Sequence, residues 1–193
     1  MTEAANTSTR IIDCARTLIL GGGYHSFSYA DISKVVGIRT ASIHHHFPAK
    51  ADLVRTLVLR YRQEALTGLS HLERNTPGSV EQLRAYTGYW EACIGDDSAP
   101  FCVCALLASQ IPALPPEVAH EVRTHFQTLS DWLTRTLERG AAAGLLRLTG
   151  SPRAEAEAFM AAVQGAMLTA RAYGDPAAFG VVTRVLLERL IVA

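Results

Sequence analysis

FSYADISKVVGIRTASIHHHFPAKADL, residues 27–53, contains two short apolar-patterned helices and the turn between them. Ser28 is a favourable N-cap for the first helix, and Asp31 completes a capping box three residues later. Gly37 ends this helix, because glycine readily adopts the left-handed conformation that closes a helix. The second helix ends before Pro48, since proline cannot continue a helix. Packed on a preceding helix, these two helices have the layout of a helix-turn-helix motif, which inserts its second helix into the major groove of DNA.

The rest of the chain also has helical periodicity. Within residues 8–20, apolar side chains recur at the i, i+4, i+7 spacing of one buried helix face. Turn-forming pairs such as Pro77-Gly78 and Pro115-Pro116 separate the later segments, and no alternating strand pattern of useful length is present. We therefore predict an all-α fold with helices over 8–20, 28–36, 40–47, 50–74, 79–94, 101–111, 116–143, 153–173 and 177–192.

Composition excludes several classes of protein. Hydrophobic residues make up 49% of the 193 residues and charged residues 19%, so the chain can bury a core and disorder is not expected. No apolar run approaches the ~18 residues of a membrane span, and the polar N-terminus lacks a signal-peptide core. We therefore expect a cytoplasmic protein with reduced thiols at its four cysteines, Cys14, Cys93, Cys102 and Cys104.

Charge is unevenly distributed, although the formal net charge is zero. Residues 1–62 hold 8 Lys and Arg against 4 Asp and Glu, which leaves 10 basic and 14 acidic residues for the remainder. This asymmetry directs an anionic partner such as double-stranded DNA towards the N-terminal part of the chain.

The stretch from residue 27 to 53 closely resembles the N-terminal signature of the TetR family of transcriptional regulators. The matching positions are Ser28, Asp31-Ile32, Gly37-Ile38, Ser42, His45, Phe47, Pro48 and Lys50. The specific resemblance covers residues 8–62, and beyond it only length and helical content are similar. The resemblance implies a three-helix helix-turn-helix DNA-binding domain over residues 1–49. A helical ligand-binding and dimerisation domain would then occupy residues 50–193.

Four positions depart from the family pattern. Thr40 stands where lysine is frequent, and His44 stands where tyrosine is usual. Arg39 and Ala49 replace residues that would cap the following helix, and each lost cap costs ~1 kcal/mol. The fold survives losses of this size, so the departures bear mainly on the DNA contacts near residues 39, 40 and 44.

The three consecutive histidines raise the question of a metal site. Successive residues on a helix are ~100° apart, and helical metal ligands use i, i+4 spacing, so His44, His45 and His46 do not converge on one ion. With Ile43 and Phe47 turned inward, His45 faces a DNA groove and His44 lies on a flank. We predict DNA contacts by these two histidines and no metal; plain surface polarity is the alternative.

Further DNA contacts are expected around the two helix starts. The N-terminus of a helix attracts phosphate, which suits Ser28, and Lys50 opposes its own helix dipole unless a phosphate lies nearby. Arg39 and Thr40 open the recognition helix and are placed to read base edges. The alternatives to phosphate contact are that Ser28 acts only as a helix cap and that Lys50 is a solvent-exposed lysine. The predicted DNA-binding set is Ser28, Arg39, Thr40, Ala41, Ser42, His44, His45 and Lys50.

The last two predicted helices indicate a homodimer. The final helix carries more apolar residues than one face can bury, Leu186 and Leu190 among them. The preceding helix offers small residues that allow close helix approach: Ala162, Gly165, Ala166 and Ala170. We predict that both helices pair with their symmetry mates in a four-helix bundle, which would place two recognition helices one DNA turn apart, ~34 Å.

An effector site is expected among the aromatic residues of the C-terminal part. Tyr86, Tyr89, Trp90 and Cys93 share helical spacing and form one stripe, which is either a ligand-pocket wall or a plain core stripe. The predicted effector-binding residues are Tyr86, Tyr89, Trp90, Phe101, Cys102 and Trp132. Residues 101–110, FCVCALLASQ, resemble the cysteine-bearing helix of a subset of the family, which implies a redox or electrophile sensor at Cys102. A small buried hydrophobe is the alternative reading of that cysteine.

No enzyme motif is recognisable in the sequence. There is no P-loop, no dinucleotide-binding turn after a strand and no paired metal-ligand motif, so we expect no catalytic residue and no cofactor. The predicted function is a ligand-responsive DNA-binding transcriptional regulator, a repressor released from a palindromic operator by a small apolar or electrophilic effector. The alternatives are a thiol-based regulator acting through Cys102, and a helical scaffold or enzyme that does not bind DNA.

Overall fold

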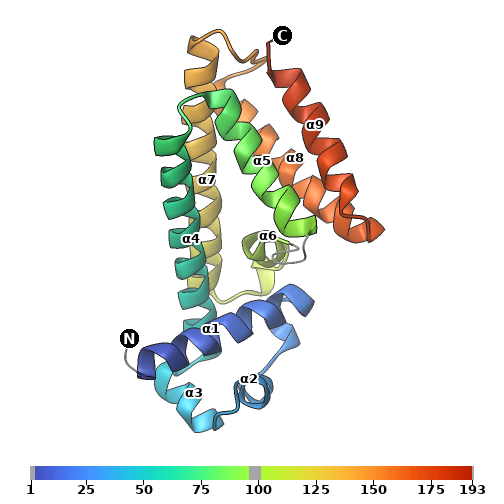
Figure 1. Ribbon diagram of the computed structural model, residues 1–193. Helices are drawn as coiled ribbons and strands as arrows, with labels where there is room; N and C mark the ends of the chain where they lie inside the picture. Colours follow the sequence, from blue (N-terminus) through green and yellow to red (C-terminus); the bar gives the residue numbers. More distant parts are fainter. Residues whose placement is uncertain (1–2, 96–100, 193) are drawn as a thin grey trace. The chain divides into compact units, whose positions relative to one another are not determined.

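The computed structural model describes residues 3–95 and 101–192. Figure 1 shows that these residues form helices joined by short connections, and the part of the chain described contains no β-strand. The α-helices are α1 (Glu3–Gly22), α2 (Tyr29–Val36), α3 (Thr40–His46), α4 (Lys50–Asn75), α5 (Ser79–Gly95), α6 (Val103–Ala108), α7 (Pro116–Ala142), α8 (Pro152–Tyr173) and α9 (Ala177–Leu190). Two short 3-10 helices, η1 (Tyr24–Ser26) and η2 (Ile111–Ala113), complete the set within those ranges.

The predicted all-α fold is confirmed, with two differences in helix length. Helix α1 begins at Glu3, five residues before the predicted start. Helix α6 ends at Ala108 rather than at residue 111, and the chain tightens into η2. Pro112 explains the change, because its missing N–H and its ring prevent an α-helix from running through that position.

The chain divides into two compact units. Unit 1 comprises residues 1–64 and 103–125, and unit 2 comprises residues 65–102 and 126–193. Helices α4 and α7 each contribute a segment to both units. The predicted domain boundary between residues 49 and 50 stays a prediction.

Unit 1 is built around α1. Its apolar face is fully buried together with side chains from the other helices of the unit, which include Ile11, Ala15, Ile19, Ile32, Ile43, Leu53, Val54, Val58, Val103, Leu107, Val118 and Val122. This burial is the main favourable term for the unit, since each large aliphatic side chain contributes roughly 1.5–3 kcal/mol.

The turn after α1 requires glycine at position 23. Gly23 has a φ of 86°, a region that other residues rarely adopt. The side-chain amide of Gln110 occupies the space where a Cβ of residue 23 would lie. The Gln110 carbonyl oxygen accepts a hydrogen bond of 2.8 Å from the backbone N–H of Tyr24. This contact ties the start of the helix-turn-helix to the segment before η2, within unit 1.

A buried carboxylate also joins two helices of unit 1. Glu121 of α7 is 6% exposed. It accepts a 2.8 Å hydrogen bond from Arg62 of α4 and lies 3.7 Å from Arg55. The two guanidinium groups compensate the cost of burying this negative charge. The α4 segment of the unit is thereby held against the first turns of α7.

Unit 2 contains α5, α8, α9 and the C-terminal parts of α4 and α7. Helices α8 and α9 lie side by side (Figure 1), with Ala166, Ala170 and Phe179 buried between 0 and 4% exposure. After α9 the chain pairs with the turn that follows α7. Val192 N–H donates to the Leu145 carbonyl over 3.0 Å.

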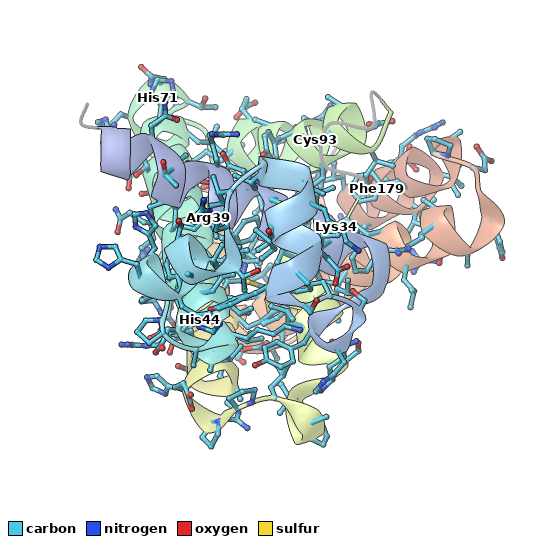
Figure 2. The ribbon with its side chains drawn as sticks, turned by 90° about the horizontal axis from the view of Figure 1, so that it is seen from below. Lys34, Arg39, His44, His71, Cys93 and Phe179 are labelled. Carbon is cyan, nitrogen blue, oxygen red and sulfur yellow. The ribbon has the colours of Figure 1, made fainter. Side chains whose placement is uncertain are left out.

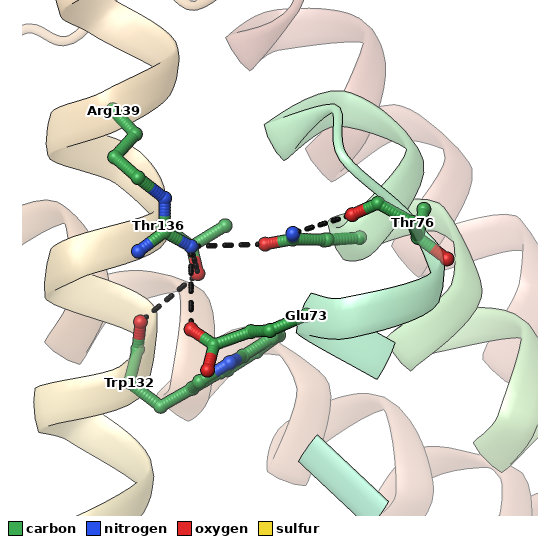
Figure 3. A network of polar contacts seen from close by, with 6 residues as sticks. Glu73, Thr76, Trp132, Thr136 and Arg139 are labelled. Carbon is green, nitrogen blue, oxygen red and sulfur yellow. Dashed lines mark hydrogen bonds and ion pairs between the residues drawn. The ribbon is translucent and has the colours of Figure 1, made fainter. Parts of the chain in front are cut away.

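Figure 3 shows a polar network in which Arg139 of α7 is the centre. Its guanidinium donates to Glu73 at the end of α4 (3.3 Å), to Gln82 of α5 (3.0 Å) and to Thr136 (3.2 Å). Gln82 in turn donates to the carbonyl of Thr76 over 2.6 Å. Because Gln82 and Thr136 are buried, this network fixes the α4–α5 connection against α7.

Candidate functional site

The first helix of the predicted helix-turn-helix begins with the expected capping box. The carboxylate of Asp31 accepts hydrogen bonds from the backbone N–H of Ser28 (2.8 Å) and from its hydroxyl (2.7 Å). These bonds lower the pKa of Asp31. Gly37 closes α2 in the left-handed conformation, with a φ of 74°. The local structure is therefore the one that the sequence predicts.

Helix α3 is anchored from its inner side. Ile43 is fully buried and Phe47 is 5% exposed, as expected from their spacing. The hydroxyl of Tyr29 in α2 donates to the carbonyl of Phe47 over 2.9 Å. Burial, with smaller effects from Asp52 and Tyr24, raises the pKa of Tyr29 to about 12, so this hydroxyl keeps its proton at neutral pH. The anchoring leaves the opposite face of α3 open.

That open face carries most of the predicted DNA-binding residues. Arg39, Ala41, Ser42, His44 and His45 are exposed, and Thr40 is half-buried. Figure 2 looks onto α2 and α3 and shows the side chains of Arg39 and His44 on the viewed side. Arg39 is the N-cap residue of α3 and has an extended backbone. Its side chain therefore starts where the recognition helix begins.

His44 has local contacts of its own. Its Nδ1 lies 3.1 Å from the carbonyl oxygen of Pro48, and its ring meets that of Tyr29 edge-on at 4.8 Å. The rings of His45 and His46 are 5.7 Å apart. Among the described residues, no group of three or more His, Cys, Asp or Glu side chains is placed to hold a metal ion.

Lys50 is more enclosed than the sequence suggests. Its ammonium group donates to the carbonyl of Phe27 and lies 3.9 Å from the centre of the Phe27 ring and 4.8 Å from that of Tyr24. Burial lowers the pKa of Lys50, and the nearby charge of Asp31 partly offsets this. Lys50 therefore connects the start of α4 to the segment before α2, whether or not it also contacts phosphate.

Two features near the helix-turn-helix were not predicted from the sequence, an exposed lysine in α2 and the cap of α4. Lys34, in the last turn of α2, is exposed in the same view as Arg39 (Figure 2). Its position could have been recognised from the sequence, because Lys34 is a basic residue in the last turn of the helix that precedes α3. The cap that Ala49 lacks is supplied by Asp52, whose carboxylate accepts the Ala49 N–H over 2.9 Å.

Unit 2 buries an aromatic cluster, defined here as Tyr86, Trp90, Cys102, Trp132 and Phe159. All five side chains are between 1 and 8% exposed. The ring of Tyr86 lies 5.5 Å from that of Trp132 and 6.5 Å from that of Phe159. Trp90 hydrogen-bonds the hydroxyl of Tyr86, and Cys102 is close enough to raise the pKa of Tyr86 further than burial alone.

The aromatic cluster differs from the predicted effector set at three positions, Tyr89, Phe101 and Phe159. Tyr89 is 58% exposed, so it lies outside the buried cluster, although its ring meets Trp90 edge-on at 5.4 Å. Phe159 of α8, which the prediction omits, belongs to it. An apolar i, i+4, i+8 repeat of Phe159, Val163 and Met167 was the signal. Phe101 is buried beside Cys102 in the chain, with the guanidinium of Arg171 5.3 Å above its ring.

The four cysteines are free thiols. Cys102 and Cys104 are almost completely buried, and Cys93 is half-buried. Burial also raises the pKa of the Cys14 thiol. A dissolved electrophile would reach Cys102 only after the structure around it opens.

Helices α8 and α9 each carry exposed apolar side chains. We define this α8–α9 face by Leu168, Tyr173, Val181 and Val185, which are between 42 and 75% exposed. The predicted face is wrong in part. Ala166, Ala170 and Leu190 are between 1 and 6% exposed, because they pack inside the protomer, where α8 meets α9. Gly165 remains on the exposed side.

No helix in the described part of the chain has the length and apolar character needed to cross a lipid bilayer.

Comparisons with known proteins agree with this architecture. The family profile described as bacterial regulatory proteins, tetR family, matches residues 11–57. The profile described as tetracyclin repressor-like, C-terminal domain, matches residues 79–186. The crystal structure of a TetR-family transcriptional regulator from Agrobacterium tumefaciens is 63% identical, with a TM-score of 0.96, over 98% of this chain and 100% of that one.

Two more distant relatives extend the comparison. A TetR transcriptional regulator from Legionella pneumophila is 26% identical, with a TM-score of 0.84, over 94% of this chain and 95% of that one. The HTH-type transcriptional regulator UidR of Escherichia coli (strain K12) is 37% identical over 65 residues. That match spans 34% of this chain and only 33% of the length of UidR. Because the C-terminal profile alone covers more than half of the residues, the chain belongs to the TetR family of DNA-binding transcriptional regulators.

Proposed function

We propose that the chain is a cytoplasmic, ligand-responsive repressor that binds a palindromic operator and is released by a small apolar or electrophilic effector. Regulators of this family bind DNA and small-molecule effectors as dimers. The observation that carries the proposal for this chain is the aromatic cluster of unit 2. Two indoles, a phenol and a phenyl ring gather there with few polar groups, and residues of these types line small-molecule sites.

The exposed face of α3 supports the DNA contacts. Arg39 starts the recognition helix and can pair with guanine through two hydrogen bonds. Ala41, Ser42 and His45 follow on the face opposite the buried Ile43. Ser28 and Lys34 lie in α2 or at its start and would contact the phosphate backbone.

The α8–α9 face supports a homodimer. Four large apolar side chains at 42% exposure or more are unusual on the surface of a monomer and suit a self-complementary contact. The occupant we propose is a second copy of the chain. A dimer with a two-fold axis through this face would carry two recognition helices. They would bind two operator half-sites ~34 Å apart.

A gel-shift titration tests the proposal as a whole. The probe is the DNA upstream of the coding region of this protein, with a scrambled duplex as the control. We expect a complex on a short palindromic site that weakens steeply as salt rises, because phosphate contacts release counterions. Small apolar compounds are then screened for release of the DNA. Equal retardation of the scrambled duplex would contradict a specific operator.

A thiol-based sensor is the second candidate, and the place of Cys102 within the aromatic cluster supports it. In that version an electrophile with an activated carbon–carbon double bond enters the aromatic cluster. The Cys102 sulfur adds to one carbon of that double bond, and the thiol proton is transferred to the other. Cys102→Ser then abolishes release by electrophiles and leaves release by unreactive compounds unchanged. If the serine variant responds to every effective compound, covalent sensing at this residue is wrong.

A further inference from the structure

The two tryptophans of the chain differ in the state of their indole N–H groups. Trp90 hydrogen-bonds the hydroxyl of Tyr86. The Nε1 of Trp132, in contrast, is buried without a hydrogen-bond partner among the described residues. Figure 3 shows that the backbone carbonyl of Trp132 accepts a bond from Thr136, whereas no contact is drawn to its indole nitrogen.

A buried donor without an acceptor is uncommon in a folded protein. Most buried polar groups are paired, because a group taken out of water loses its hydrogen bonds to solvent. An indole N–H can donate and cannot accept, so the partner that Trp132 lacks is a hydrogen-bond acceptor. Gln164 also has a buried oxygen without a partner among the described residues, but the Gln164 side chain is half-exposed, whereas Trp132 is 2% exposed.

The surroundings of Trp132 restrict the charge of that acceptor. The rest of the aromatic cluster consists of rings and one thiol, and burial raises the pKa of Tyr86 so that the phenol stays neutral. Arg171 lies over Phe101, outside the aromatic cluster, and is itself exposed. Arg139, whose network reaches the Trp132 carbonyl through Thr136, is already paired with Glu73. An anion beside Trp132 would therefore lose its hydration without gaining an unpaired counter-charge.

We propose that the effector is a neutral, largely apolar compound with a carbonyl or ether oxygen, and that Trp132 donates a hydrogen bond to this oxygen. This assignment rests on the effector site of the proposed function and names its ligand class. The hydrogen bond exists only in the liganded protein. It therefore contributes to the preference of the ligand for the bound conformation, which is the quantity that shifts a conformational equilibrium.

Three small probes separate the parts of the proposal. Acetophenone is neutral and has a carbonyl oxygen, α-methylstyrene replaces that oxygen by CH₂ with the same skeleton, and benzoate carries a charge. The full chain, labelled with ¹⁵N, gives two indole N–H signals, which Trp90→Phe and Trp132→Phe assign. We expect acetophenone to move the Trp132 signal downfield. We expect α-methylstyrene to perturb it without that downfield shift, and benzoate to leave it unchanged.

A matched pair of variants tests the hydrogen bond by affinity. Trp132→Phe replaces the indole by a smaller aromatic ring without a donor, and the loss of volume affects both probes alike. The affinity for acetophenone relative to α-methylstyrene should therefore fall about fivefold to tenfold. Tyr89→Phe changes an exposed residue outside the aromatic cluster and should leave this ratio unchanged. An unchanged ratio in Trp132→Phe overturns the assignment of the donor. Benzoate binding as tightly as acetophenone overturns the neutral class.

Operator binding is measured in parallel with the wild-type chain. Failure to bind any operator contradicts the proposed function, while the indole signals still report whether a neutral acceptor binds at Trp132. If neither acetophenone nor α-methylstyrene perturbs an indole signal, the ligand assignment is overturned even where the operator is bound.

Discussion

The recognition surface of α3 and the aromatic cluster of unit 2 present their chemistry in opposite environments. On α3, Arg39, Ser42 and His45 are exposed and stand on a short helix whose inner side is buried. In the aromatic cluster, the side chains are at most 8% exposed, and one indole donor is left without a partner. The first region is ready to meet a large partner without rearrangement. The second can bind a ligand only by exchanging contacts within the protein, which is what a switch requires.

Because α3 is exposed and the aromatic cluster is buried, we expect mutations in the two regions to have different consequences. Changes on exposed surfaces should alter assembly or DNA affinity and leave folding intact. Changes in the aromatic cluster should alter stability and ligand response together, because the same side chains form the core.

The largest effect is expected at the α8–α9 face. Val181→Glu combined with Val185→Glu should give a folded monomer whose operator affinity is lower by about 100-fold or more, because two linked half-sites bind far better than one. Sedimentation and gel shift measure the two effects. Leu145→Glu is the control, since Leu145 is 44% exposed and lies outside this face. A dimer that survives the double change would place the interface elsewhere.

The next effect contrasts Phe159 with Tyr89. Phe159→Ala should lower the free energy of unfolding by about 3–5 kcal/mol, since it leaves a cavity around a ring that is 1% exposed. Tyr89→Ala should change it by about 0.5 kcal/mol or less, because Tyr89 is 58% exposed. Urea unfolding measures both values. Similar losses in the two variants would mean that Tyr89 is part of the core.

A smaller effect distinguishes Lys50 from Lys34. Either lysine changed to methionine should reduce the salt slope of operator binding by about one unit if it contacts a phosphate. Lys50→Met should in addition lower the melting temperature, because its ammonium group is bonded to the Phe27 carbonyl and lies over two rings. Lys34→Met should not. An unchanged slope in Lys50→Met would restrict that residue to an internal role.

The cap of α4 should show a modest effect. Asp52→Ala removes the acceptor of the Ala49 N–H and should cost about 0.5–1 kcal/mol of stability. Asp52→Asn keeps an acceptor oxygen and should cost less. Thermal unfolding of the two variants gives the comparison, and equal losses would assign the effect to charge rather than to the hydrogen bond.

The smallest effect depends on pH. Two hydrogen bonds from Ser28 lower the pKa of Asp31, so the stabilisation is present above the unfolded pKa of about 4 and is lost as the pH falls through the folded value. The stability difference between wild type and Asp31→Asn should therefore be largest at neutral pH and shrink towards pH 3. A difference that grows in acid would contradict this assignment.

The sequence predicts features that depend on local spacing. The capping box at Ser28, the turn at Gly37 and the inward positions of Ile43 and Phe47 all follow from the order of neighbouring residues. The same holds for the helix boundaries, most of which fall within two residues of the prediction.

Features that depend on tertiary contacts were not predictable in this way. Tyr89 shares helical spacing with Tyr86, but the buried face of α5 follows the i, i+4, i+8 series of Tyr86, Trp90 and Ile94 and leaves Tyr89 outside. The bond from Lys50 to Phe27 joins residues 23 positions apart. Whether the Trp132 indole finds an acceptor depends on every helix around it, and no local pattern contains that information.

The glycine turn after α1 constrains how the sequence of this protein can vary. Because the Gln110 amide fills the place of a side chain at Gly23, a larger residue at position 23 meets both this amide and an unfavourable positive φ. A random library at position 23 should yield glycine whether or not Gln110 is present, because shortening residue 110 removes the steric clash and leaves the backbone strain of any replacement at position 23. Gln110 also accepts the hydrogen bond from Tyr24, so residues 23 and 110 should be taken from the same parent when a chimeric regulator is assembled.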